Sequence, residues 1–292
     1  INQAVEKIKN SKQPIIISGG GVLYSEAEQE LSKFAKKHNI PVTSTVMGIG
    51  CMTKDDPYYI SAVGALGEGS SNSLSKDTDL ALAIGTKLAD FTTGSWANFE
   101  NPNFKLVSVN TARYDTTKHL ATPVISDAKV GLQKISEALG DWKAPDDWYK
   151  RAIKEKNEWD AYVEKQSGPT NQEEPSYAHA VGAVYRNSDP SDIVVTAAGG
   201  LVGEVVQVWK PKQLNTFETE WGFSCMGYEI SGALGIKMAK PDQDVVVFVG
   251  DGSYLLNNTD IYSSVIYDQK LIIIVCDNGA VSYTHLRAHE TS

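Results

Sequence analysis

The chain has 292 residues, and its 27 Lys and Arg against 36 Asp and Glu give a formal net charge of −9. This acidic balance argues against a surface for nucleic acid or anionic lipid. The length is sufficient for a large core and favours two domains. No apolar run reaches the length of a bilayer span, and the first residues lack the pattern of a signal peptide. We therefore expect a cytoplasmic protein with no membrane partner.

Residues 1–140 alternate predicted helices and strands in the manner of a parallel sheet. The expected helices are 3–9, 25–38 and 129–139, and the expected strands are 14–18, 41–45, 80–84 and 104–109. This pattern predicts a Rossmann-like middle domain. A Gly19-Gly20-Gly21 turn follows the first strand, but it gives no full GxGxxG and no evident acidic ribose ligand, so we favour a tight turn over a dinucleotide site.

Residues 141–172 are predicted to form a linker helix with polar loops, because Pro145 and Pro169 break the pattern at each side. A second domain is expected over residues 173–280, with a helix at 177–185, a strand at 193–196 and a helix ending at Ala239. Residues 281–292 show neither helix nor strand periodicity and resemble a translated sequencing adapter. We expect them to be a non-native tail, and the chain to be a fragment.

Three cysteines, Cys51, Cys225 and Cys276, lie in apolar or glycine-rich segments without CxxC spacing. This pattern favours buried, reduced thiols over metal ligands or disulfides.

The stretches 245–254 and 271–278 predict two buried parallel strands, and each strand has a polar residue at its carboxyl end. The segment between them is long enough for a crossover helix, which predicts a right-handed βαβ unit. Asp251 and Asn278 should therefore lie close together. Gly250 and Gly252 on either side of Asp251 would let the backbone approach a phosphate.

This GDG motif, followed by a helix, a strand and an Asn, resembles the fingerprint of thiamine diphosphate enzymes. The resemblance implies that Asp251, Asn278 and the main-chain carbonyl of Ala280 hold the Mg²⁺ that anchors the cofactor's diphosphate. Such oxygen donors suit Mg²⁺, which also takes ligands from phosphates and water. By the same resemblance, Ser253 would bond a phosphate oxygen.

Three further cofactor contacts follow from the resemblance. Gly199 and Gly200 occupy the position at which other members contact the diphosphate, although the pair may equally make only a strand-to-helix turn. Met226 aligns with the apolar residue that props the cofactor in its bent form, and its alternative is an ordinary core position.

Segments 84–96, 197–204 and 216–230 resemble the inositol-catabolism ring hydrolases that act on 3D-(3,5/4)-trihydroxycyclohexane-1,2-dione. The resemblance runs from residue 1 to Ala280 and implies hydrolytic C–C ring cleavage to 5-deoxy-glucuronate through an acyl-thiamine intermediate. The DFTTGSW stretch, 90–96, is the most discriminating segment. Its Phe91, Thr92, Thr93, Ser95 and Trp96 either touch substrate or pack between domains, and we favour packing.

The family's activating Glu belongs to an amino-terminal domain outside this chain, and the active site forms between subunits. The resemblance therefore implies a homo-oligomer, a small cyclic dione as substrate, and no activity for this chain alone. Two alternatives stay open. One is a thiamine diphosphate-dependent carboligase of the acetolactate or glyoxylate type, and the other is a non-catalytic nucleotide-binding module built on the triple-glycine turn.

Overall fold

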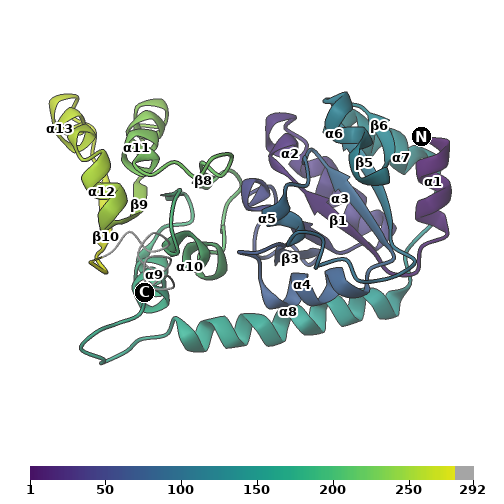
Figure 1. Ribbon diagram of the computed structural model, residues 1–292, viewed down its shortest axis with the longest axis horizontal. Coiled ribbons are helices and arrows are strands. Elements are labelled where there is room, and N and C mark those ends of the chain that lie inside the picture. The colour runs from purple at the N-terminus through teal and green to yellow at the C-terminus, as the bar shows by residue number, and fades with distance from the viewer. Residues whose placement is uncertain (280–292) are drawn as a thin grey trace, which may run out of the picture. The chain divides into compact units, whose positions relative to one another are not determined.

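The computed structural model describes residues 1–279, in which the chain forms two compact units (Figure 1). Unit 1 is Ile1–Tyr162, and unit 2 begins at Val163. Every strand pair of both sheets is parallel, which confirms the predicted α/β class with two Rossmann-like domains. None of the helices within residues 1–279 combines the length and apolar character needed to cross a membrane.

The sheet of unit 1 has the strand order β3-β2-β1-β4-β5-β6, the doubly wound order of dinucleotide-binding folds. Its strands are β1 Pro14–Ser18, β2 Val42–Ser44, β3 Tyr59–Ala62, β4 Leu80–Ile84, β5 Lys105–Asn110 and β6 Thr122–Ile125. The two central strands, β1 and β4, are buried throughout because helices cover both faces.

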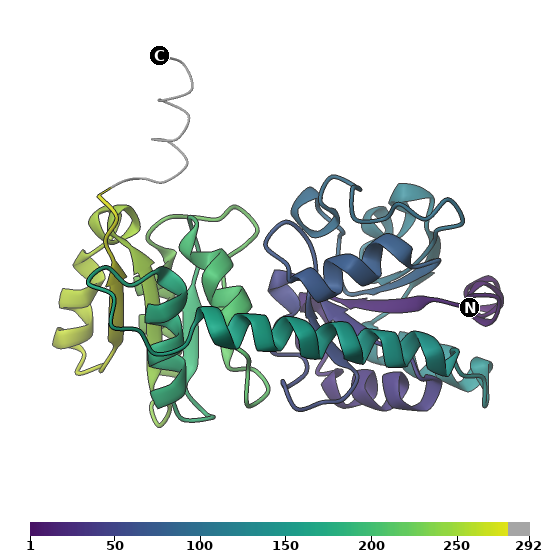
Figure 2. The ribbon, with the colours of Figure 1, turned by 90° about the horizontal axis from the view of Figure 1, so that it is seen from below.

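Two helical layers cover the sheet of unit 1, and Figure 2 shows its strands between them. Helices α1, α3 and α7 pack on one face, and α4 and the first part of α8 pack on the other. The helices and turns of this unit are α1 Asn2–Lys9, α2 Gly20–Tyr24, α3 Glu28–His38, η1 Val46–Gly48, α4 Gly69–Asp77, α5 Asp90–Thr93, α6 Arg113–Thr117, η2 Lys118–Leu120, α7 Ala128–Leu139 and α8 Asp146–Gln166.

The helix predicted at 25–38 begins later, at Glu28, because Glu26 has a positive φ of 49° that no helix tolerates. A separate short helix, α2, comes before it and starts inside the triple-glycine turn. The long helix α8 begins directly after Pro145, as the sequence predicts. Trp148 anchors α8 on the sheet, since its indole nitrogen donates to the Pro14 carbonyl oxygen over 2.8 Å.

Unit 2 has a four-stranded sheet in the order β10-β9-β7-β8. Its strands are β7 Ile193–Thr196, β8 Phe217–Thr219, β9 Val245–Gly250 and β10 Ile272–Cys276. Its helices are α9 Tyr177–Asn187, α10 Leu201–Val208, α11 Tyr228–Ala239, α12 Asp251–Leu256 and α13 Thr259–Ile266. Ile230 and Ala233 of α11 pack on one face of this sheet, and Trp209 packs on Phe248 at the other.

The crossover between β9 and β10 was predicted as one helix and consists of two, α12 and α13. Asn257 leaves the helical region at the break, with φ −146°, and its side chain donates to the carbonyl oxygen of Gly227 (3.3 Å) and to Ser231 (2.5 Å). These two bonds to α11 hold Asn257 in a non-helical conformation, and the helix is interrupted there.

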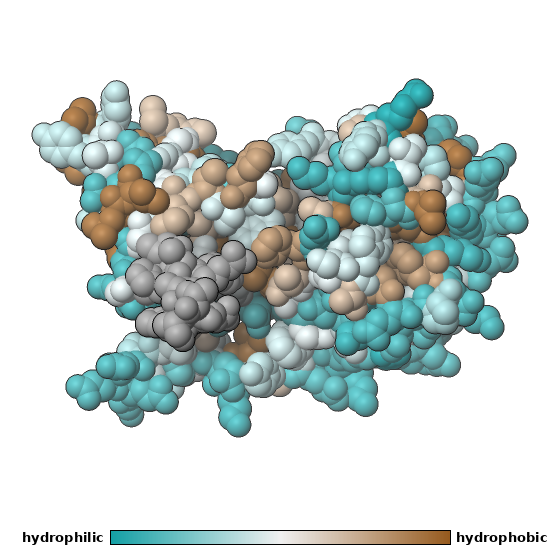
Figure 3. Space-filling model, viewed as in Figure 1, coloured by the Kyte–Doolittle hydropathy of each residue, from teal (hydrophilic) through white to brown (hydrophobic). Residues whose placement is uncertain are grey.

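Large apolar side chains are exposed on α12 and α13, at the left of Figure 3. They are Leu255, Leu256, Tyr262, Val265 and Ile266. An apolar surface of this kind is unusual for a face that stays in water.

Candidate cofactor site

The strand order of unit 2 reverses beside β7, because β8 lies on one side of it and β9 on the other. Ligands of open α/β sheets bind beyond the carboxyl ends of the strands at such a point. The loops that leave β7 and β9 there are residues 197–200 and the segment that starts at Asp251. The topology therefore places a candidate site over the predicted residues.

Gly199 and Gly200 form the loop after β7. Gly199 has φ +80°, a conformation that favours glycine, and a Cβ atom added to either residue would meet no other atom within 4 Å. The space above both residues is thus open to a ligand. Their contact with a diphosphate stays a prediction.

Asp251 and Asn278 lie at the same edge of the sheet. Their strands, β9 and β10, are neighbours in register up to the pair Gly250 and Cys276. The Tyr177 hydroxyl, at the start of α9, hydrogen-bonds the Asn278 side chain and is close enough to Asp251 for the negative charge to act on it. Burial first, and the neighbouring negative groups next, raise the pKa of Tyr177. The Tyr177 hydroxyl thus interacts with both predicted metal ligands.

The donor set suits a hard cation. Searched over residues 1–279, the structure contains no cluster of three or more His, Cys, Asp or Glu side chains that could hold a metal by themselves. The predicted set instead has one carboxylate, one amide oxygen and the Ala280 carbonyl, and such a set leaves coordination positions for phosphate and water, as Mg²⁺ prefers. Ala280 lies outside the described residues. Asp277 accepts a bond from the Gly279 amide (2.9 Å) in the turn before it.

Ser253 is buried, and its side chain hydrogen-bonds the carboxylate of Glu229. The hydroxyl proton therefore points at Glu229. A phosphate bond from Ser253 would have to come from its main-chain amide, which lies in the first turn of α12, where amides have no partner inside the helix.

Glu229 itself was not predicted as a site residue. It is fully buried in the first turn of α11, with one oxygen accepting from the Ala198 amide (3.1 Å) and the other from the Gly227 amide (2.9 Å). Burial raises its pKa against the opposing effect of these bonds. The available sequence signal was a lone carboxylate at the start of an apolar, glycine- and alanine-rich helix.

Met226 is half-exposed and comes directly before Gly227, whose φ is +93° and which starts α11. Partial exposure leaves the thioether accessible, so its role as a prop stays a prediction. In the preceding loop, Glu220 accepts bonds from the amides of Phe223 (2.9 Å) and Cys225 (2.7 Å).

The expectation that all three cysteines are buried is wrong for Cys225, which is exposed, whereas Cys51 and Cys276 are buried. The reason is local: Cys225 belongs to the loop that Glu220 holds at the surface, whereas Cys276 ends a strand. All three are free thiols.

The triple-glycine turn of unit 1 also lies at a strand-order reversal, between β1 and β4. There, however, the two loops touch. A Cβ atom on Gly21 would lie 2.6 Å from the Cα of Gly85, and one on Gly19 would lie 2.5 Å from the Gly85 carbonyl oxygen. The glycines are thus explained by backbone contact at the point where a dinucleotide binds in related folds, which supports the tight-turn interpretation.

Part of the 90–96 stretch packs inside unit 1. Thr93 is fully buried, and the Trp96 ring contacts Phe99, Phe104 and His119. Phe91, in contrast, is 56% exposed. Packing within unit 1 therefore accounts for Thr93 and Trp96, whereas the expected packing between domains stays a prediction.

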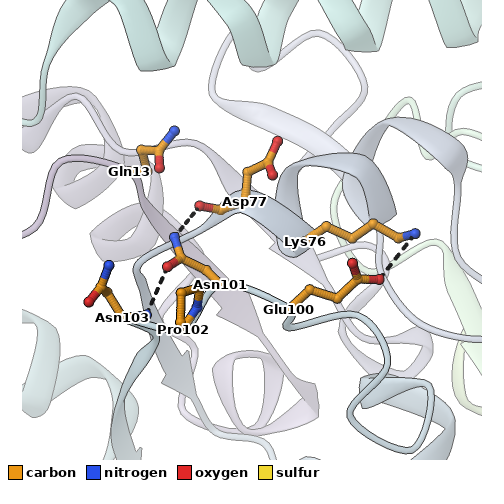
Figure 4. A pocket seen from close by; sticks show the side chains of 7 residues that line it. All are labelled: Gln13, Lys76, Asp77, Glu100, Asn101, Pro102 and Asn103. Carbon is orange, nitrogen blue, oxygen red and sulfur yellow. Dashed lines mark hydrogen bonds and ion pairs between the residues drawn. The ribbon is translucent and has the colours of Figure 1, made fainter.

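A pocket elsewhere in unit 1 is lined mostly by polar and charged side chains (Figure 4). Lys76 forms an ion pair with Glu100 (3.3 Å) there, and the Asn101 side chain donates to the carbonyl oxygen of Asp77 (2.8 Å). These polar groups are bonded to one another rather than directed at a common ligand position.

Two family models match the chain and identify its class. The thiamine pyrophosphate enzyme central domain matches residues 1–135, and the thiamine pyrophosphate enzyme C-terminal TPP binding domain matches residues 197–291. Together they cover more than half of the chain, which therefore belongs to the thiamine pyrophosphate enzymes. The second match extends into residues 281–292, so the expectation of a non-native tail stays a prediction.

Individual relatives are more specific. The chain is 35% identical to a protein of Geobacillus thermodenitrificans and 36% identical to one of Clostridium tetani, in each case over 96% of this chain and 47% of the relative. Both relatives are named 3D-(3,5/4)-trihydroxycyclohexane-1,2-dione hydrolase. These findings confirm the resemblance to the ring hydrolases. The chain spans about half the length of the curated relatives it matches.

Proposed function

We propose that this protein acts in the thiamine diphosphate- and Mg²⁺-dependent hydrolysis of a C–C bond in the ring of 3D-(3,5/4)-trihydroxycyclohexane-1,2-dione. The observation that carries the proposal is the pair Asp251 and Asn278 at the ends of neighbouring strands, beside the strand-order reversal. The names of the relatives support the substrate. We further propose that the reaction passes through an acyl-thiamine intermediate and yields 5-deoxy-glucuronate.

Each group of predicted site residues has its own proposed role. Asp251, Asn278 and the Ala280 carbonyl bind Mg²⁺, and the metal in turn binds the diphosphate. The main chain at 199–200 and 250–253 lies along the phosphates, where glycines permit close approach. Met226 supports the bend of the cofactor. When bound, thiamine diphosphate would supply the carbon nucleophile for a ketone of the substrate.

Cofactor binding is tested by calorimetric titration of the chain with thiamine diphosphate, with and without Mg²⁺. Binding is expected only with the metal. Asp251→Asn should weaken it by about tenfold or more, because the charged ligand is lost. Asp260→Asn is the matched control: it removes the same charge from α13 of the same unit. Equal losses in both variants would contradict the proposed metal site.

Turnover is tested in a hybrid in which this chain replaces the matching segment of a hydrolase relative. The expected result is consumption of the cyclic dione with formation of 5-deoxy-glucuronate. A hybrid that binds the cofactor and leaves the dione unchanged would contradict the proposed substrate. Consumption of pyruvate or glyoxylate would instead favour the carboligase alternative. Binding of NAD or FAD without any thiamine dependence would favour the nucleotide-binding module.

A further inference from the structure

We infer that Glu229 is a positioning residue of the cofactor site, because its buried carboxylate holds together the three chain segments that carry the predicted cofactor contacts. This inference rests on the proposed function. It concerns how the site is kept in shape and adds no ligand to the metal.

Each bond of Glu229 reaches a different segment. One carboxylate oxygen accepts from the Ala198 amide in the loop after β7 (3.1 Å), and the other accepts from the Gly227 amide at the start of α11 (2.9 Å). The Ser253 hydroxyl, in α12 after β9, donates to the same carboxylate. The residue has no exposed surface. Water therefore cannot replace any of these bonds.

The three partners are close in sequence to predicted contacts. Ala198 precedes the Gly199-Gly200 pair, Gly227 follows Met226, and Ser253 follows the GDG motif. Two weaker links join the same segments in pairs. The Ser224 hydroxyl donates to the Ala197 carbonyl oxygen (3.3 Å), and Asn257 donates to that of Gly227 (3.3 Å). Glu229 joins all three segments at once.

A carboxylate is suited to this task because it accepts through both oxygens and needs no donor in return. A glutamine has the same shape but presents an NH₂ group in place of one oxygen. That group would face the amide of Ala198 or of Gly227, and a buried amide without a partner is costly. The segment concerned would then shift, together with the predicted contact beside it.

The test compares Glu229→Gln with Glu204→Gln, a half-buried carboxylate of α10 in the same unit. Two quantities are measured for each protein: the dissociation constant for thiamine diphosphate at saturating Mg²⁺, and the thermal midpoint. We expect Glu229→Gln to raise the dissociation constant by about tenfold or more, as for loss of a hydrogen bond to a charged group. Glu204→Gln should leave it unchanged.

Ser253→Ala keeps the inference testable if Glu229→Gln does not fold, since it removes only one of the three bonds. We expect it to raise the dissociation constant about threefold to tenfold, as for one hydrogen bond. A lower thermal midpoint with an unchanged dissociation constant in both folded variants, or in Ser253→Ala alone if Glu229→Gln does not fold, would overturn the inference and leave the proposed function intact. Failure of the unaltered chain to bind thiamine diphosphate with Mg²⁺ would instead count against the proposed function.

Discussion

Three carboxylates of unit 2, Glu204, Glu218 and Glu229, have a raised pKa, and burial is the first cause in each. A pKa raised in the folded state means that the native protein binds a proton more readily than the unfolded chain. The stability that this proton contributes is fully present below the unfolded pKa, about 4.5 for Glu, and is lost as the pH rises through the folded pKa.

We predict that the free energy of unfolding of the unaltered protein, relative to that of Glu229→Gln, falls as the pH rises above about 4.5. The glutamine does not titrate, so the difference between the two proteins isolates this one group. Urea unfolding at a series of pH values measures it. A difference that stays constant or grows with pH would show that Glu229 is not held in a desolvated state.

The cysteines should react unequally. Cys225 is exposed next to Met226, whereas burial raises the pKa of Cys51 to about 12 and leaves almost no thiolate at neutral pH. We predict that iodoacetamide labels Cys225 in the native protein and spares Cys51, as read by peptide mass spectrometry. Thiamine diphosphate with Mg²⁺ should slow the labelling of Cys225. Labelling in urea, where all three thiols should react, is the control.

Some individual residues of the candidate site can be predicted from the sequence, and others cannot. The location of Asp251 and Asn278 at one edge is predictable, because Asp251 directly follows β9, Asn278 comes two residues after the end of β10, and parallel strands end at the same edge. Glu229 and Tyr177 are not, because their partners Ala198, Ser253 and Asn278 are distant in sequence and meet only in the folded unit. The direction of the Ser253 hydroxyl depends on the same tertiary contact.

Among the elements, the buried strands with uninterrupted apolar runs are predicted with accurate ends. β1, β4 and β7 begin and end at the predicted residues, because uninterrupted apolar runs bounded by turns mark strands covered on both faces. β3, β6 and β8 were missed. Each has only three or four residues. β7 is equally short, but it has an apolar run, whereas polar residues interrupt β3 and β8. β6 contains Pro123, which the sheet tolerates because β6 is at its edge.

The contact between the loops after β1 and β4 gives a prediction for an element. Gly21→Ala should destabilise the protein by about 1–3 kcal/mol, as for overpacking, because the added Cβ would lie 2.6 Å from the Gly85 Cα. Gly20→Ala is the matched control in the same turn, since its Cβ would lie 3.3 Å from the nearest atom and should cost less. Denaturant unfolding compares the two, and equal losses would contradict the assigned contact.

For the whole molecule, the segment between α8 and α9 is the expected point of proteolysis. Residues 171–176 are exposed and have no regular secondary structure. We predict that a glutamate-specific protease cuts first at Glu173 or Glu174, leaving two stable fragments that each contain one sheet. Mass spectrometry of a time course would locate the first cut. An earlier cut within residues 1–166 or within residues 177–279 would contradict this prediction.

Catalytic turnover is also a property of the whole molecule. The chain spans about half the length of its curated relatives. The family resemblance stated from the sequence implies an activating Glu outside this chain. We predict that the 292-residue chain alone shows no turnover of the cyclic dione and only weak Mg²⁺-dependent cofactor binding. A steady-state assay with added thiamine diphosphate checks this, and robust hydrolysis would overturn it.

We further propose that the exposed apolar residues of α12 and α13 become covered in a homo-oligomer.

The two touching loops of unit 1 also set a limit on how that unit can change. Glycine has no side chain to remove, so no substitution at Gly19, Gly21 or Gly85 can create space by shortening a side chain. Every exchange there adds atoms to a contact that is already tight. Space for a nucleotide at this point of unit 1 would therefore require a change in the course of one of the two loops. In unit 2, by contrast, a Cβ atom at Gly200 or Gly250 would meet no atom within 4 Å, so a side chain can be added at the corresponding edge without a clash.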